Sequence, residues 1–312
     1  MDNSSEHAPL SVVIDAHQHF WDPARADYPW MVGAAAPLRR VFGPADLLPE
    51  LHGNGVLGTV VVQARSSIAE THELLALTVN HPFVLGVVGW VDLTAADVAE
   101  TIASLRQDAN GHLLVGVRHQ VHDEADAQWL LRADVQRGLA AVQEAGLAYD
   151  LLVRPRELPA AIQVVKNFPA LRFVIDHLAK PEIRQGIMEP WSGLMDALRQ
   201  ERAHVWCKLS GMINLADHAA WRSEDLRPYI LRVLDDFGAD RCMFGSDWPV
   251  LTLAGTYSRV LEALRVNLGH LDPQARQYIL GDSAVEAYRL GTGRLSGARV
   301  AAANATDRSP QG

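Results

Sequence analysis

The sequence predicts a single (β/α)8 barrel, a TIM barrel of the α/β class. Eight short, nearly continuous apolar runs recur along the chain, and helix-like segments separate successive runs. Continuous apolar runs are typical of parallel strands that helices cover on the outside. Polar residues follow several of the runs directly, at the strand ends where barrel enzymes build their sites. Periodicity alone leaves an open, doubly wound sheet as the alternative.

The expected strands are rich in β-branched and aliphatic residues. The first is Val-Val-Ile-Asp-Ala at 12–16, and the second is Val-Leu-Gly-Thr-Val-Val-Val-Gln at 56–63. The other six are expected at 83–91, 114–118, 148–153, 171–176, 205–209 and 241–245.

The helices between them are marked by start and stop signals. Thr94 with Asp97 three residues later resembles a capping box, and Gly146 lies just past the end of a periodic segment. Segment 21–43 contains Asp-Pro and Tyr-Pro pairs and is expected to be a long loop after the first strand. The predicted helices are 71–80, 96–107, 134–145, 159–167, 191–202, 227–237 and 257–267.

The domain organisation follows from these elements. We expect a flexible segment at 1–11, one barrel domain at 12–295 and a disordered tail at 296–312, where the composition becomes small and polar. No linker divides the barrel, and no repeat with the period of a solenoid is present in the sequence.

Composition and charge narrow the class of function. The chain has 312 residues, 48% of them hydrophobic, and a formal net charge of -9. Because no basic run is present, nucleic acid is not expected as a partner. No apolar run is long enough to span a bilayer, so no membrane association is expected. Cys207 and Cys242 lie in apolar runs, which favours a reducing, cytoplasmic compartment. A homo-oligomer is left open.

The first chemical signal is His17-Gln18-His19 at the end of the first strand. Because side chains alternate along a strand, both imidazoles face the same side and would point into the barrel mouth. Two imidazoles so placed can share a divalent ion. A hydrogen-bonded histidine pair is the structural alternative.

Two further signals fall on the same rim. Asp176-His177 closes the sixth strand, and Asp247 follows the eighth in Phe-Gly-Ser-Asp-Trp-Pro. Strands eight and one are neighbours in a closed barrel, so Asp247 is expected beside the histidine pair. A carboxylate beside imidazoles or a metal can activate water as a general base. A turn-forming Asp247 and a backbone-bonded Asp176 and His177 are the alternatives.

Cations and polar residues lie near the strand ends. Arg118 ends the fourth strand, Arg154 follows the fifth and Lys208 lies near the end of the seventh, and a guanidinium suits a carboxylate or a polarised carbonyl. We expect at least one of these cations to serve the substrate, with Lys208 counted as a substrate contact, and a structural ion pair is the alternative for each. The other expected substrate contacts are Trp21, Asp22, Gln63, His119 and Trp248.

Several familiar motifs lack support. Residues 53–58 fit GxGxxG by letter but precede a strand, so the dinucleotide context is missing. The sequence contains no GxxxxGK[ST] phosphate loop and no GxSxG nucleophile elbow.

Taken together, these blocks resemble the amidohydrolase-2 family of the amidohydrolase superfamily over about residues 12–290. The opening block is Ile-Asp-Ala-His-Gln-His-Phe-Trp-Asp at 14–22, and the closing block is 244–249. Gly-Val-Arg at 116–118, Ile-Asp-His at 175–177 with Lys-Pro at 180–181, and Cys-Lys-Leu-Ser-Gly at 207–211 match in the same order. The most similar branch holds L-fuconolactonases, L-rhamnono-lactonases and 2-pyrone-4,6-dicarboxylate lactonases.

This resemblance implies a barrel hydrolase that opens a sugar-acid lactone of the L-fuconolactone type in carbohydrate catabolism, by attack of water on the carbonyl. It implies His17, His19, His177 and Asp247 as the central residues, with Asp247 as general base and Arg118 or the histidines polarising the carbonyl. It also implies a small-molecule lactone as the partner.

One departure from the wider superfamily concerns the metal. Binuclear members carry a carboxylated Lys or a Glu at the end of the fourth strand and a His at the end of the fifth. Here the fourth ends in Arg118, and 148–153 contains no His. We therefore expect at most one divalent cation of the zinc type, on His17, His19 and Asp247 with His177 as a weaker ligand. Metal-free catalysis is left open.

Three other functions stay open at this point. They are hydrolysis of a dicarboxylate lactone, metal-dependent decarboxylation on the same barrel, and a non-catalytic binding role.

Overall fold

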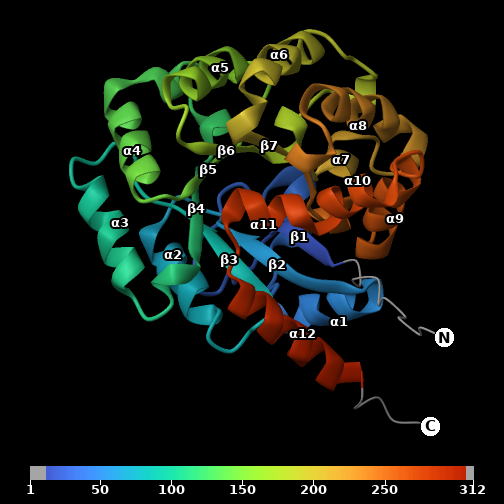
Figure 1. Cartoon of the computed structure of the whole chain (residues 1–312), viewed down its shortest axis with the longest axis horizontal. Helices are drawn as coiled ribbons and strands as arrows, with labels where there is room; N and C mark the ends of the chain where they lie inside the picture. The colour runs from blue at the N-terminus through green and yellow to red at the C-terminus, as the bar shows by residue number, and fades with distance from the viewer. Residues whose placement is uncertain (1–11, 307–312) are drawn as a thin grey trace, which may run out of the picture.

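Eight parallel strands in the computed structural model form one sheet in the order β1 to β8 (Figure 1). The structure describes residues 12–306. The sheet closes between β8 and β1, because the Asp247 N–H donates to the His17 carbonyl at 2.8 Å and the His19 N–H donates to the Trp248 carbonyl at 2.7 Å. The predicted barrel is therefore confirmed and the open sheet is excluded.

All eight strands lie where the apolar runs predicted them, with shifts of a few residues at their ends. Strand residues are buried on both faces because helices cover the outside and side chains fill the inside. The strands are β1 (Val13–Gln18), β2 (Val56–Val62), β3 (Val84–Gly89), β4 (Leu114–His119), β5 (Ala148–Leu151), β6 (Arg172–Ile175), β7 (Val205–Leu209) and β8 (Cys242–Phe244).

The outer layer consists of helices that follow the strands around the barrel (Figure 1). Their buried faces carry aliphatic residues at helical spacing, which form the larger apolar core with the outside of the sheet. The helices are α1 (Pro44–Asn54), α2 (Ile68–Leu77), α3 (Val98–Gln107), α4 (Ala133–Glu144), α5 (Leu158–Asn167), α6 (Trp191–Leu198), α7 (Met212–Leu215), α8 (Ser223–Phe237), α9 (Tyr257–Asn267), α10 (Pro273–Gln277), α11 (Ser283–Tyr288) and α12 (Thr292–Thr306).

The end of the barrel where the strands begin is closed by α11. Its Ala287 carbonyl accepts from Arg172 Nε at 2.8 Å, and Ser283 Oγ donates to the Ala239 carbonyl at 3.2 Å. Tyr288 and Ala284 join the apolar cluster formed by inward-facing strand residues such as Val174. The opposite end, where the strands finish, is thereby left as the place for a cavity.

Two helix predictions need correction at their ends. Helix α3 begins at Val98 after Asp97, which makes no side-chain cap bond. Thr94 Oγ donates instead to Asp92 at 2.7 Å, so the capping box is wrong. The predicted helix 191–202 ends at Leu198 and continues as a 3-10 helix, Arg199–His204.

The C-terminal segment differs from the expected disordered tail, since α12 continues to Thr306. Arg294 anchors its start by donating to the carbonyls of Val84, Thr78 and His81 at 3.0, 2.6 and 2.9 Å. Ala298 is buried, and the alanine-rich composition favours a helix. The expected flexible segment 1–11 and the residues after 306 lie outside the described part. Within that part, no helix has the length and apolar character needed to cross a membrane.

Candidate active site

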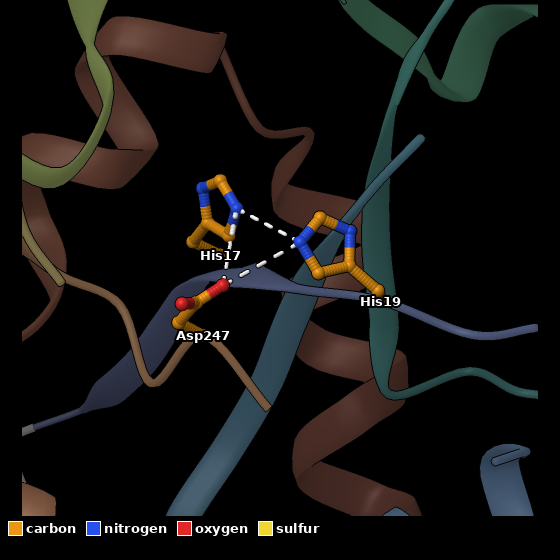
Figure 2. Close-up of side chains that lie close together, drawn as sticks. All are labelled: His17, His19 and Asp247. Carbon is orange, nitrogen blue, oxygen red and sulfur yellow. Dashed lines mark hydrogen bonds and ion pairs between the residues drawn. The ribbon is translucent and has the colours of Figure 1, made fainter. Parts of the chain in front are cut away.

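Three side chains from neighbouring strand ends meet at the mouth of the barrel (Figure 2). His17 Nε2 lies 3.2 Å from His19 Nε2. Asp247 Oδ1 lies 3.8 Å from His17 Nε2 and 3.5 Å from His19 Nε2. Asp247 has φ +61°, a left-handed conformation in which Asp is tolerated better than most residues. The backbone bonds across the β8–β1 seam hold this turn beside the histidines, as the sequence predicted.

The donor set of these three residues fits a single metal ion. Ligands about 2.0–2.1 Å from a tetrahedral zinc are about 3.3 Å from one another, and the three separations here are 3.2, 3.5 and 3.8 Å. His19 Nδ1 lies 2.7 Å from the Val62 carbonyl, which can only accept. The proton of His19 is therefore on Nδ1, and its Nε2 lone pair faces the other two donors.

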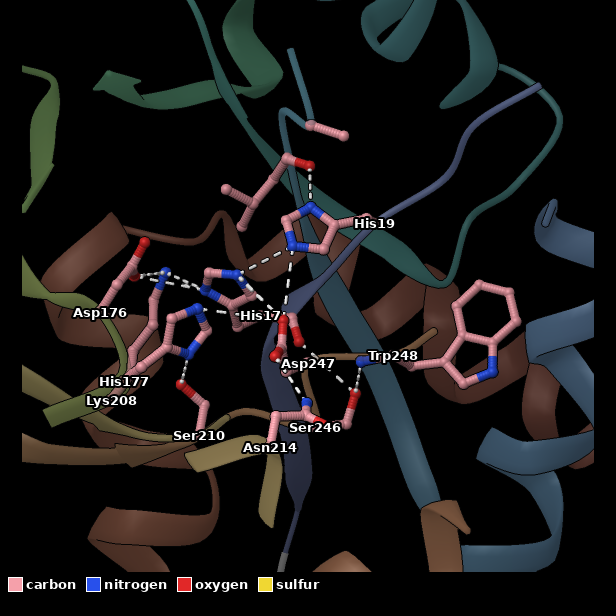
Figure 3. Close-up of polar contacts among 12 residues, drawn as sticks. His17, His19, Asp176, His177, Lys208, Ser210, Asn214, Ser246, Asp247 and Trp248 are labelled. Atoms are coloured by element: carbon pink, nitrogen blue, oxygen red, sulfur yellow. Dashed lines mark hydrogen bonds and ion pairs between the residues drawn. The ribbon is translucent and has the colours of Figure 1, made fainter. Parts of the chain in front are cut away.

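A third histidine and an amide face the same carboxylate (Figure 3). His177 Nε2 lies 3.9 Å from Asp247 Oδ1, and its Nδ1 is 2.8 Å from Ser210 Oγ. Asn214 Nδ2 donates to Asp247 Oδ2 at 3.3 Å. Both oxygens of Asp247 are thus surrounded by groups from β1, the turn after β6 and the segment after β7.

Beneath this centre lies a buried network of charges. Lys208 Nζ is 2.6 Å from Asp150 Oδ2. It also lies 2.9 Å from Asp176 Oδ1 and 3.1 Å from His17 Nδ1 (Figure 3). Arg118 Nη1 donates to Asp176 Oδ2 at 2.9 Å and lies 3.3 Å from His17 Nε2. His17, Asp176 and His177 also offer atoms close enough for an ion. Lys208 and Arg118 both pair with Asp176, so its charge is already balanced within this network.

Burial and neighbouring charges set the protonation of this site. Burial acts to raise the pKa of Asp247, but His177, His19 and His17 hold that pKa below its ordinary value. Burial lowers the pKa of His177 to about 4 and moves the pKa of His17 well below its ordinary value. Burial acts to raise the pKa of Asp176 too, but Lys208 and the other cations keep it well below the ordinary value. The centre therefore presents an ionised carboxylate beside the neutral imidazoles of His17 and His177 at neutral pH.

A cavity of about 380 Å³ opens above these residues. Of the predicted catalytic residues, His19, His177, Arg118 and Asp247 line the cavity, and buried His17 lies directly behind His19. The positive side chain Arg154, expected on the rim, lines it as well.

The six expected substrate contacts lie outside the lining of this cavity. Lys208 and Gln63 are buried in polar networks, Gln63 Nε2 donating to the Arg118 carbonyl at 3.1 Å. His119 stacks on Trp129 with ring centroids 4.3 Å apart and lies 2.7 Å from Glu124.

The other three belong to the loop that follows β1 or pack against it. Trp21 Nε1 donates to the Leu38 carbonyl at 3.1 Å, and Trp248 packs on Phe42 with centroids 5.4 Å apart. Asp22 accepts from the Ala24 N–H at 2.9 Å and borders a separate cavity. These contacts stabilise the loop, because aromatic and polar groups near a strand end serve packing as readily as binding.

Other lining residues were not selected from the sequence as site residues. Trp30 comes from the loop after β1 and donates through Nε1 to the Ala64 carbonyl at 3.1 Å. His122, Lys180 and Asn214 complete the polar wall. The sequence motif contains Lys180 only as part of the Lys-Pro pair at 180–181. His122, Lys180 and Asn214 share one signal, since each follows a strand end by a few residues.

Comparison with known proteins agrees with this geometry. The amidohydrolase family model matches residues 14–290. The chain belongs to the amidohydrolase family. It is 40% identical over 283 residues to an L-fucono-1,5-lactonase of Burkholderia ambifaria, covering 89% of this chain and 95% of that protein.

A second L-fucono-1,5-lactonase, from Burkholderia multivorans, is 38% identical to this chain. The alignment covers 89% of this chain and 96% of that protein. Among solved structures, an amidohydrolase from Burkholderia multivorans with bound zinc superposes with a TM-score of 0.82 at 36% identity. That alignment covers 90% of this chain and 100% of the other. Membership of this family confirms the sequence resemblance.

Proposed function

We propose that this amidohydrolase opens a sugar-acid lactone of the L-fucono-1,5-lactone type by attack of water on the lactone carbonyl. One observation carries the proposal. An ionised Asp247, faced by three histidines, lies on the wall of a cavity that is also lined by His122 and Asn214, each of which has a buried polar atom without a partner among the described residues. The names of the two relatives that share 38% and 40% identity with this chain support the same substrate class.

Asp247 is the general base in this reaction. Its carboxylate accepts a proton from a water molecule held between it and the surrounding imidazoles while that water attacks the carbonyl carbon. A base placed within hydrogen-bond reach of the water contributes about 10²- to 10⁴-fold to the rate. Asn214 donates to the second carboxylate oxygen and so fixes the orientation of Asp247.

The carbonyl oxygen gains negative charge as water adds, and donors at the centre stabilise it. Arg118 lines the cavity and lies 3.3 Å from His17, so its guanidinium can reach an oxygen placed at the histidine pair. Asp176 holds Arg118 in place through the 2.9 Å ion pair.

We also propose that His17, His19 and Asp247 hold one divalent cation of the zinc type. The spacing of the three donor atoms and the fixed tautomer of His19 fit such an ion, and a relative with 36% identity binds zinc. An ion bound there would polarise the carbonyl and lower the pKa of water. Without it, the His17 Nε2–H can donate to His19 Nε2 at 3.2 Å.

Unsatisfied polar atoms in the cavity favour a hydroxylated ligand. His122 Nδ1 and Asn214 Oδ1 are buried without a hydrogen-bond partner among the described residues. Burial lowers the pKa of His122 to about 2. It is therefore neutral, and its Nε2 proton lies toward Asp123 Oδ1 at 3.2 Å. His122 Nδ1 and Asn214 Oδ1 are then both acceptors, which suit sugar hydroxyls.

The proposal is tested by acid release from a panel of sugar-acid and dicarboxylate lactones, with a pH indicator. The protein is assayed as purified, after chelation and after added Zn²⁺ or Mn²⁺. We expect turnover of L-fucono-1,5-lactone and a loss of about 10³-fold in kcat for Asp247→Asn. The matched control is Asp235→Asn, an exposed aspartate on α8, which should retain full activity.

Folded protein that releases no acid from any sugar lactone would refute the proposed function. Full activity after complete removal of bound metal would refute the role of the cation and leave the lactonase proposal standing.

A further inference from the structure

The segment after β6 forms a left-handed turn of four residues that carry side chains. His177, Leu178, Ala179 and Lys180 have φ values of +52°, +54°, +57° and +52°. This conformation costs non-glycine residues about 1–2 kcal/mol each. Leu178 and Ala179 are fully buried, while His177 and Lys180 both line the cavity. The turn thus directs the first and fourth side chains to the same wall.

The Lys180 ammonium has no partner in the described part of the chain. No carboxylate lies within 4.0 Å of it, and it makes no hydrogen bond through its side chain, although the residue is more than half buried. The charges that act on it are Asp247 and Asp123, which favour the ammonium, and Arg154 and Arg118, which oppose it. A buried cation without a partner is unfavourable unless a ligand supplies one.

Lactone opening requires a proton donor for the ring oxygen, and the central residues do not supply one. When the tetrahedral intermediate collapses, the bond between the carbonyl carbon and the ring oxygen breaks, and the departing alkoxide needs a proton. Asp247, His17, His19 and Arg118 face the water and the carbonyl oxygen. Arg154 also lines the cavity, but a guanidinium does not release its proton near neutral pH. Lys180, whose ammonium can release a proton near neutral pH, also lines the cavity.

We propose that Lys180 is a catalytic residue that donates a proton to the ring oxygen as the lactone opens. This inference rests on the proposed lactonase function. Water loses one proton to Asp247 and forms the new C–O bond, the ring C–O bond breaks, and its electron pair takes a proton from Lys180. The neutral amine is then reprotonated, with the proton held on Asp247 as the source through water. The new carboxylic acid loses its own proton to the solvent, and the product leaves as a hydroxy carboxylate.

The acid–base properties of Lys180 agree with this role. Burial lowers the pKa of Lys180 to about 8, with Arg154 and Arg118 acting in the same direction. A donor whose pKa is near the working pH transfers its proton more readily than an exposed lysine would. The strained turn explains how the side chain is held there, because backbone strain of this kind persists where the surroundings fix it.

The test compares two leaving groups on one sugar. L-Fucono-1,5-lactone releases a basic alkoxide, whereas its 5-thio analogue releases a thiolate, which needs no proton to depart at neutral pH. Wild type, Lys180→Met and Lys180→Arg are assayed on both substrates at saturating concentrations. The matched control is Lys166→Met, an exposed lysine on α5.

We expect Lys180→Met to lower kcat on the lactone by about 10²-fold or more, and on the thiolactone by less than about fivefold. Lys180→Arg keeps the positive charge, but its guanidinium cannot release a proton to the ring oxygen, so this variant should show the same selective loss. Lys166→Met should match wild type on both substrates. Far-ultraviolet circular dichroism and the unfolding midpoint verify that each variant is folded.

An equal loss on both substrates, or no loss on either, would overturn the role of Lys180, since Asp247 would then return the proton itself. Wild type that is inactive on both substrates would overturn the proposed function instead, and this inference with it.

Discussion

Two lysines near the same histidine-rich centre, Lys208 fully buried and Lys180 partly buried, differ in their partners. Lys208, inside the barrel, lies within 2.6–3.1 Å of Asp150, Asp176 and His17. Lys180, on the cavity wall, has no acidic group within 4.0 Å among residues 12–306. Tyr288 OH closes the network beneath Lys208 by donating to Asp150 at 2.8 Å.

We infer from this difference that the charge of Lys208 stabilises the fold, whereas the charge of Lys180 is available to a ligand. A cation surrounded by carboxylates has no capacity left for substrate, and its removal leaves those carboxylates uncompensated. A cation without a partner contributes little to stability and is therefore free to act in chemistry. Three predictions test this contrast, and they follow from the largest expected effect to the smallest.

The largest effect is expected for Lys208→Met. This change removes the ammonium that pairs with Asp150 and Asp176 and leaves both carboxylates buried. Breaking a buried ion pair costs about 3–5 kcal/mol. Denaturant unfolding should show that loss in the free energy of unfolding, whereas Lys180→Met should lose less than about 1 kcal/mol. Similar losses for the two variants would remove the distinction between the lysines.

The second effect is the pH dependence of kcat. Because the ammonium form of Lys180 is the active one and its pKa is about 8, activity is present below that pH and is lost above it. We expect kcat to fall about tenfold for each unit above pH 8, after correction for spontaneous hydrolysis. The charged or titratable groups that line the cavity around Lys180 are Asp247, Asp123, Arg118, Arg154, His19, His122 and His177.

In Lys180→Arg the low residual rate should be flat across this range, because arginine stays protonated. Lys166→Met should keep the wild-type profile. A fall near pH 8 that persists in Lys180→Arg would assign the titration to another group.

The smallest effect concerns the left-handed turn that positions Lys180. Ala179→Gly relieves a positive φ but removes one buried methyl group, worth about 0.8 kcal/mol. The relief of about 1–2 kcal/mol is offset by the loss of that methyl group and by the entropic cost of glycine, about 0.5–1 kcal/mol, so the free energy of unfolding should change by less than about 0.5 kcal/mol. The control is Ala161→Gly, buried within α5, which should lose about 1–2 kcal/mol. Equal losses would show that the turn is unstrained.

The sequence by itself determined the barrel and its central residues. Parallel strands covered on both faces must be apolar along their length, and that pattern is visible in all eight runs. Side-chain alternation then fixed His17 and His19 on one face, and the adjacency of the first and last strands brought Asp247 to them. These are consequences of local geometry, so they needed no knowledge of the loops.

Helix α1 and the tail show where local signals failed. Pro49 and Gly53 interrupt the helical pattern of α1, yet the helix forms between the loop after β1 and β2. The tail has weak patterning, but Arg294 fixes the start of α12 against three carbonyl groups. In both cases tertiary packing overrides propensity.

Only the tertiary structure decided which polar groups face the substrate. Lys208 lies near the end of one apolar run and Lys180 follows another, and the sequence favoured Lys208 as a substrate contact. Lys208 lies on a strand whose inward face meets Asp150 and Asp176 below the mouth, so its charge is used inside the barrel. Lys180 lies on a turn whose φ values no local pattern predicts, and that turn carries its ammonium into the cavity. Strand alternation can be read from the sequence because it is local, whereas the direction of a loop side chain depends on everything packed around it.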